Sequence, residues 1–303
     1  MTKQTTTVHH SHHHHPVQHP QVSTLFHHIS IVFMSVLWGC LSFSIKSTIP
    51  RPSLLQAESD DSRLVLNYYN NYNSLFHAVF MLLACGYCLL KEPFESNRLM
   101  TSRELWTIRI SLAYYIFDTA AGIYYMYNDF WMSLHHVLIF LAYYHSLRYS
   151  SIASEMFVTM FVGEISNPFL ILMKTSQYEG QTQKSILLGA GFIITYLMLR
   201  TYPAYKLAKR VCLSDAEIVI KVSCTSMLCV SFYWIFEIFV QISMRAATLL
   251  GLTSARELFS EQARVCWLAG CLLLCGRLFV KGTLLEQRFP AYTAKGRKWS
   301  IFE

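Results

Sequence analysis

Long apolar runs recur along the whole chain, and they limit what it can fold into. A helix needs about 20 mostly apolar residues to span the hydrocarbon core of a bilayer. We identify eight runs near that length, at residues 27–45, 74–90, 107–126, 130–147, 152–173, 186–204, 219–243 and 264–281. The last is the weakest, because Arg277 lies near its end. The sequence therefore predicts an all-α fold, a polytopic bundle of membrane helices.

Composition and charge support this prediction. Hydrophobic residues make up 53% of the chain and charged residues only 14%, whereas soluble domains carry about 25% charged residues. The net charge of +7 is dispersed between the runs, which argues against nucleic acid as a partner. The nine cysteines fall mostly inside the runs, where we expect them to pack as small apolar side chains.

The ends of the chain differ from its middle. Residues 1–24 contain seven histidines and two prolines, which predicts a disordered tail; weak zinc or copper binding is the less favoured alternative. Residues 25–69 are expected to form a first transmembrane helix and a polar loop. Residues 246–303 are expected to form an extra transmembrane helix and a basic tail. Lys and Arg are in excess in cytosolic loops of membrane proteins. Their distribution in this chain predicts a cytosolic C-terminal tail whether the chain has seven or eight spans. The side of the N-terminus stays open.

Several polar side chains fall inside the apolar runs. An ionisable group at the centre of the bilayer costs about 2.5 kcal/mol or more, so such groups face the bundle interior or pair with one another. Because six consecutive runs each contribute at least one, we expect one shared polar interior. The residues are His77, Asp118, His135, His136, His145, Glu164, Asn167, Arg200 and Glu237.

Two of these residues, His135 and His136, are adjacent in sequence. Neighbouring positions on a helix point about 100° apart, so one imidazole is expected to face a cavity and the other to bond a neighbouring helix. His145 is expected at the membrane boundary. A carboxylate from Asp118 or Glu164 could orient a catalytic histidine. A buried network that only fixes helix registry fits the same residue types slightly better, and no metal site is expected.

Prolines and glycines suggest local geometry within two runs. Pro168 and Pro203 are expected to kink the fifth and sixth runs and to free carbonyl groups toward a cavity. Gly189 and Gly191 are small enough to let two helices approach closely.

Six stretches follow one another as they do in TLC domains. They are FHAVFMLLACGY, YYIFDTAAGIYYMY, SLHHVLIFLAYY, FVGEISNPFLILMK, IITYLMLRTYPAY and SFYWIFEI, and the match covers about residues 70–245. The most specific part is the histidine pair followed by Glu164, Ser166 and Pro168. The chain thus resembles the TLC-domain family, which includes ceramide synthases and translocon-associated proteins. The resemblance implies a six-helix core around a polar cavity, with one or two flanking transmembrane helices.

Ceramide synthases join a long-chain base to an acyl group from acyl-CoA, using paired histidines and downstream acidic residues. Their later helix carries a His-Asp pair and a further Asp, where this chain has Gly163-Glu164 and then Asn167. The chain therefore resembles the non-synthase branch, which is associated with membrane lipid homeostasis.

The resemblance implies a lipid-handling protein of the endoplasmic reticulum or another endomembrane, with sphingolipid or phospholipid as its partner. The residues implied to line its lipid cavity are His77, Asp118, His135, His136, Glu164, Asn167 and Arg200. If the protein is instead an N-acyltransferase, then His135, His136 and Glu164 are its catalytic residues and acyl-CoA is a substrate; no other cofactor is expected. A factor for secretory cargo is the third alternative. We expect that replacing His136 or Glu164 by Ala abolishes lipid function and largely spares abundance.

Overall fold

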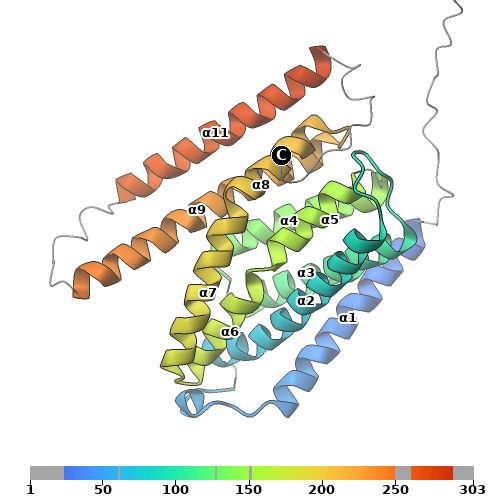
Figure 1. Cartoon of the computed structure of the whole chain (residues 1–303). Helices are drawn as coiled ribbons and strands as arrows, with labels where there is room; N and C mark the ends of the chain where they lie inside the picture. The colour runs from blue at the N-terminus through green and yellow to red at the C-terminus, as the bar shows by residue number, and fades with distance from the viewer. Residues whose placement is uncertain (1–23, 61, 127, 150–151, 250–260, 289–303) are drawn as a thin grey trace, which may run out of the picture.

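The computed structural model describes residues 24–60, 62–126, 128–149, 152–249 and 261–288. Within these ranges the chain is helical and contains no β-strand (Figure 1). The elements are α1 (Thr24–Thr48), η1 (Ser53–Leu55), α2 (Arg63–Lys91), α3 (Ser102–Tyr124), α4 (Phe130–Tyr149), α5 (Ala153–Glu164), α6 (Asn167–Tyr178), α7 (Thr182–Arg200), α8 (Tyr202–Leu213), α9 (Ile218–Leu249) and α11 (Glu261–Arg288). The predicted His-rich tail up to residue 23 and the basic tail after residue 288 lie outside the described residues.

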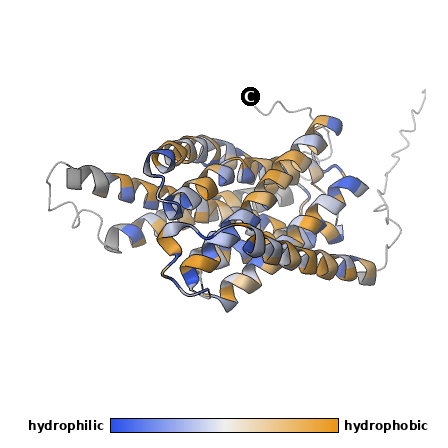
Figure 2. Cartoon of the chain, turned by 90° about the horizontal axis from the view of Figure 1, so that it is seen from below, coloured by the Kyte–Doolittle hydropathy of each residue, from blue (hydrophilic) through white to orange (hydrophobic). Residues whose placement is uncertain are grey.

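Five helical stretches of the described chain are long and apolar enough to cross a membrane. They are Phe26–Thr48, Arg63–Lys91, Ala153–Tyr178, Thr182–Leu213 and Ile218–Met244. The prediction of an all-α polytopic bundle is therefore confirmed, and hydrophobic residues, coloured orange in Figure 2, occupy much of the helices. The expected spans 107–126, 130–147 and 264–281 are also helical, as α3, α4 and α11, but they fall outside this set of five.

Two of the five stretches are broken near their prolines. α5 ends at Glu164 and α6 begins at Asn167, with Pro168 in the first turn of α6. α7 ends at Arg200 and α8 begins at Tyr202, with Pro203 in the first turn of α8. Proline lacks the N–H that would continue the preceding helix and is tolerated only in a first turn. The predicted kinks thus coincide with two helix ends. Thr201 leaves the helical conformation between α7 and α8, whereas Ile165 and Ser166 keep helical backbone angles between α5 and α6.

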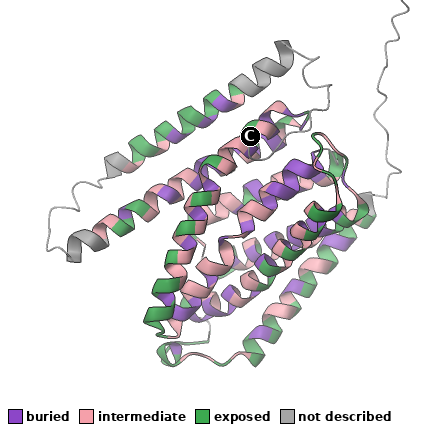
Figure 3. Cartoon of the chain, viewed as in Figure 1, coloured by how far each residue is buried: buried purple, intermediate pink, exposed green. Residues whose placement is uncertain are grey.

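The helices differ in how deeply they are buried. α5 is buried along most of its length, whereas α1, α7 and α11 expose much of their surface (Figure 3). α1 packs on α3, and α11 packs on α8 and α9. Polar side chains fasten these outer helices, since Trp38 of α1 donates to the Ile110 carbonyl of α3 and Arg264 of α11 pairs with Glu237 of α9. The core of the bundle therefore lies around α5.

The segment between α2 and α3 is fixed to the start of α5. Thr101 and Glu104 form a capping box at the first turn of α3, which satisfies backbone N–H groups that a helix start leaves unpaired. Arg98 pairs with buried Glu104 at 2.5 Å, and its carbonyl accepts from the backbone N–H of Ala153 at 2.9 Å. The first residue of α5 is held in place by this segment.

Candidate functional site

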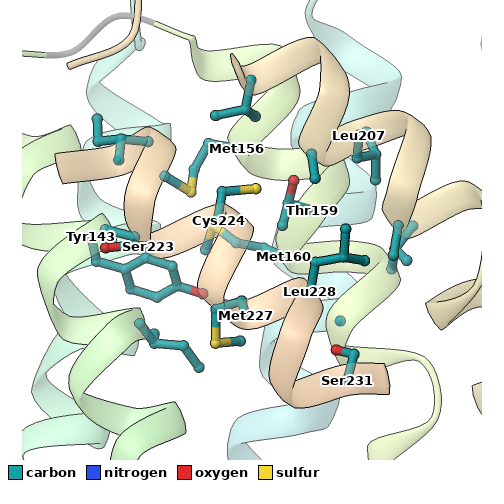
Figure 4. Close-up of a pocket in the computed structure, with 18 of the residues that line it drawn as sticks. Tyr143, Met156, Thr159, Met160, Leu207, Ser223, Cys224, Met227, Leu228 and Ser231 are labelled. Atoms are coloured by element: carbon teal, nitrogen blue, oxygen red, sulfur yellow. The ribbon is translucent and has the colours of Figure 1, made fainter. Parts of the chain in front are cut away.

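A cavity of about 110 Å³ lies against α5 and is walled by α4, α7, α8 and α9 (Figure 4). Apolar side chains dominate its lining. They include Ile139, Ile152, Met156, Met160, Leu207, Val211, Ile220, Met227 and Leu228. Its polar lining residues include Tyr115, His135, Tyr143, Glu164, Asn167, Arg200 and Ser231.

The ionisable and amide groups gather toward one end of the cavity. Along α5 the lining begins at Ile152 and Met156 and ends at Glu164, an advance of about 18 Å at 1.5 Å per residue. Along α9 it runs from Ile220 to Ser231, the latter bonded to the Arg200 guanidinium on the neighbouring wall. In Figure 4, Met156 and Ser231 lie at opposite ends of the drawn lining. The cavity thus has a polar end and an apolar arm, and its whole length along α5 is a little more than half the hydrocarbon core of a bilayer, which is about 30 Å thick.

The two adjacent histidines point to different places. His135 lines the cavity, and its ring lies 5.0 Å from that of Trp234. His136 is outside the lining and contacts α3, with its Nδ1 3.3 Å from Asp118 Oδ2 and 3.4 Å from Thr119 Oγ1. The expected division between a cavity-facing and a helix-bonding imidazole is present. The Nδ1 atom of His135 is buried without a hydrogen-bond partner among the described residues, which leaves it available to a bound molecule.

Glu164 ends α5 and lies in the polar end of the cavity. Tyr115 Oη donates to its Oε1 at 3.1 Å, and Asn167 Nδ2 donates to its Oε2 at 2.8 Å. Asn167 lies three residues after Glu164, a spacing that brings two side chains together along a helix. A buried carboxylate needs such donors to offset its lost hydration. Glu164 is therefore held in one position.

Arg200 ends α7 at the other helix break. Its guanidinium donates to the Gly163 carbonyl at 2.5 Å and to Ser231 Oγ at 3.5 Å. Its buried Nε makes no hydrogen bond to any described residue. A buried N–H donor without a partner is costly, so this group favours a ligand with an oxygen acceptor at the polar end.

The remaining predicted polar residues lie outside the cavity. His77 is buried on α2, where Nε2 lies 2.9 Å from Ser111 Oγ and the ring stacks on Tyr114 at 3.8 Å. Asp118 accepts from Asn70 Nδ2 at 2.8 Å in addition to its contact with His136. His77, Asp118 and His136 therefore form buried polar contacts beside the cavity, while four of the seven predicted cavity residues line it: His135, Glu164, Asn167 and Arg200.

Two further residues lie elsewhere. His145 Nδ1 is 2.8 Å from Glu217 Oε2 just before α9, and Glu237 pairs with Arg264. Within the described residues, no group of three or more His, Cys, Asp or Glu side chains is placed to hold a metal ion.

Several residues that complete the site could not be identified from the sequence. Tyr115 bonds Glu164, and its ring lies 5.3 Å from that of His136. Ser231 and Asn70 were not singled out at all. A serine or asparagine in an apolar run carries no signal of its partner, because that partner comes from a distant helix.

The comparisons with known proteins agree with this architecture. The TLC domain matches residues 69–241, more than half of the chain. No curated protein and no solved structure matches the chain. The chain is a multi-helix membrane protein, and it belongs to the TLC-domain family.

Proposed function

We propose that this protein binds a membrane lipid in the α4–α9 cavity and so acts in membrane lipid homeostasis. The observation that carries the proposal is the uneven polarity of the cavity wall, with His135, Glu164 and Arg200 at one end and mostly methionine and aliphatic side chains along the rest. A lipid has the same division, with a polar head joined to hydrocarbon.

The size of the cavity limits what it can bind without a change in shape. A cavity of about 150 Å³ is enough for benzene in an engineered protein, and this one is about 110 Å³. An acyl chain therefore enters only if the lining moves. Met156, Met160 and Met227 supply that freedom, since methionine side chains are unbranched and adapt to irregular shapes.

Photo-crosslinking tests lipid binding at the cavity. The detergent-purified protein is incubated with a phospholipid that carries a diazirine at the end of one acyl chain, irradiated, digested and analysed by mass spectrometry. Crosslinks on Met156, Met160 or Met227 are expected. Crosslinks confined to lipid-facing residues such as Leu187 and Met198, which are 74% and 68% exposed, would refute the proposal.

Acyl transfer of the ceramide-synthase type is the second candidate, and the His136–Asp118 contact favours it. A carboxylate beside an imidazole is the arrangement that orients a general base. However, the imidazole with the carboxylate is outside the cavity lining, and His135, which lines the cavity, lacks one. Turnover of acyl-CoA and a sphingoid base by the purified protein, abolished in His136→Ala, would establish this candidate in place of passive lipid binding.

We also propose that the protein resides in the endoplasmic reticulum or another endomembrane, with its C-terminal tail in the cytosol. The support is the excess of basic residues in the loops that share a side with the tail. Protease added to sealed microsomes should remove an epitope placed after Glu303. Protection of the epitope until detergent is added would contradict this orientation.

A further inference from the structure

A second and larger cavity, of about 460 Å³, lies between α1, α2 and α3 and shares no lining residue with the first. Its walls are three helix faces. The lining residues are Gly39, Ser42, Phe43, Lys46 and Ser47 on α1, Leu66, Tyr69 and Asn70 on α2, and Phe117 and Ala121 on α3, with Tyr125 directly after α3. On each wall, successive lining residues are one, three or four positions apart, so each set forms one continuous stripe along the helix. We call this site the α1 groove.

Two contacts fasten α1 to its neighbours near the groove. Before the groove, Ser35 Oγ donates to the Ala113 carbonyl at 3.1 Å and holds α1 on α3. Within the stretch of α1 that lines the groove, Ile45 is buried in a cluster with Leu55 and Tyr69, and Tyr69 itself lines the groove. The groove remains open outward, since Phe43 is 76% exposed on its wall.

The α1 groove combines one cation with an apolar floor. Lys46 is its single charged lining residue, is exposed and forms no ion pair with any described residue. It lies in the last turn of α1, where a transmembrane helix reaches the level of the lipid headgroups. Basic pockets between transmembrane helices bind anionic lipid headgroups, and this groove offers no carboxylate that would repel one.

The α1 groove also touches the polar contacts of the TLC domain. Asn70 lines the groove and donates to Asp118, which in turn contacts His136. α1 itself lies before the region that matches the family. A molecule in the groove would thus contact both α1 and the family domain.

We propose that the α1 groove binds one anionic glycerophospholipid, with its phosphate at Lys46 and an acyl chain along Phe43, Leu66 and Phe117. Ser42 lies one turn from Lys46 on the same face of α1 and lines the groove with it. This proposal is independent of the lipid in the α4–α9 cavity.

Native mass spectrometry tests the assignment. The full chain is purified in detergent doped with phosphatidylglycerol or with phosphatidylcholine, and the dissociation constant of the first bound lipid is measured. Phosphatidylglycerol is expected to bind more tightly. Lys46→Ala should weaken phosphatidylglycerol binding about fivefold, the equivalent of about 1 kcal/mol per basic residue at a membrane surface, and should leave phosphatidylcholine binding unchanged.

Two further variants make the test specific. Lys91→Ala removes an exposed lysine at the far end of α2 and should leave the preference intact. Ala121→Phe fills the groove while keeping Lys46 and should lower phosphatidylglycerol binding. Equal affinity for the two lipids, equal weakening by Lys46→Ala and Lys91→Ala, or unchanged binding in Ala121→Phe would each overturn the proposal.

Discussion

His136 and Asp118 meet across the α3–α4 contact, with 3.3 Å between Nδ1 and Oδ2. The neighbouring His135 faces the cavity instead. His136 thus serves the packing of the bundle, and His135 is placed to contact a bound molecule. This division changes what we expect of the two alanine variants.

His136→Ala should destabilise the protein, because it leaves the buried Asp118 carboxylate with Asn70 as its remaining described hydrogen-bond partner. Stranding a buried polar group costs about 1–3 kcal/mol. This revises the expectation from sequence that His136→Ala spares abundance. His135→Ala should lower lipid binding with a smaller loss of stability. Thermal unfolding in detergent and lipid binding are measured for both variants. Equal losses of stability in His135→Ala and His136→Ala would contradict the different roles of the two histidines.

Tyr115 and Glu164 should be energetically coupled through their 3.1 Å hydrogen bond. We expect Tyr115→Phe and Glu164→Gln to be non-additive by about 1 kcal/mol, since contacting residues in one network share an interaction energy. A double-mutant cycle of unfolding free energies measures this coupling. Additive effects would show that the bond contributes nothing to the position of Glu164.

The close approach of α6 and α7 depends on two glycines. A Cβ on Gly191 would lie 2.9 Å from the Phe169 ring, and one on Gly189 would lie 3.1 Å from Met173 Sδ. Gly191→Ala should cost about 1–3 kcal/mol of stability through overpacking. Gly189→Ala should cost less, because methionine yields more easily than a ring.

A glycine in open surroundings provides the control for this prediction. A Cβ on Gly270 of α11 would meet no atom within 4 Å. Gly270→Ala should therefore be neutral or stabilising by up to about 1 kcal/mol, the difference in helix propensity. Unfolding midpoints of the three variants give the ranking, and a neutral Gly191→Ala would refute the packing role.

Much of the fold follows from local features of the sequence. Apolar length predicts the helices, Pro168 and Pro203 predict the two breaks, and the 100° step of a helix predicts that His135 and His136 diverge. Gly189 and Gly191 likewise meet another helix closely, as their size suggests. Each of these inferences depends on one segment and its own stereochemistry, so a single sequence is enough.

The partners within the site do not follow in the same way. Asp118 could have paired with any polar group at its depth, and only the packing of α2, α3 and α4 selects Asn70 and His136. The apolar wall from α8 and α9 was also not foreseen, because Leu207 and Met227 look like ordinary core residues in sequence. Long-range packing decides which of them faces a cavity.

Binding of lipid in the α4–α9 cavity is tested most directly by filling that cavity. Met227→Trp places an indole in the lining, whereas Val222→Trp places the same group on the exposed face of the same helix, where Val222 is 45% exposed. Both variants should be stable enough to purify, which thermal unfolding verifies. Delipidated protein is titrated with a fluorescent phospholipid and the dissociation constant is measured. We predict about tenfold weaker binding for Met227→Trp and wild-type binding for Val222→Trp; the same dissociation constant in all three proteins would contradict a lipid site in this cavity.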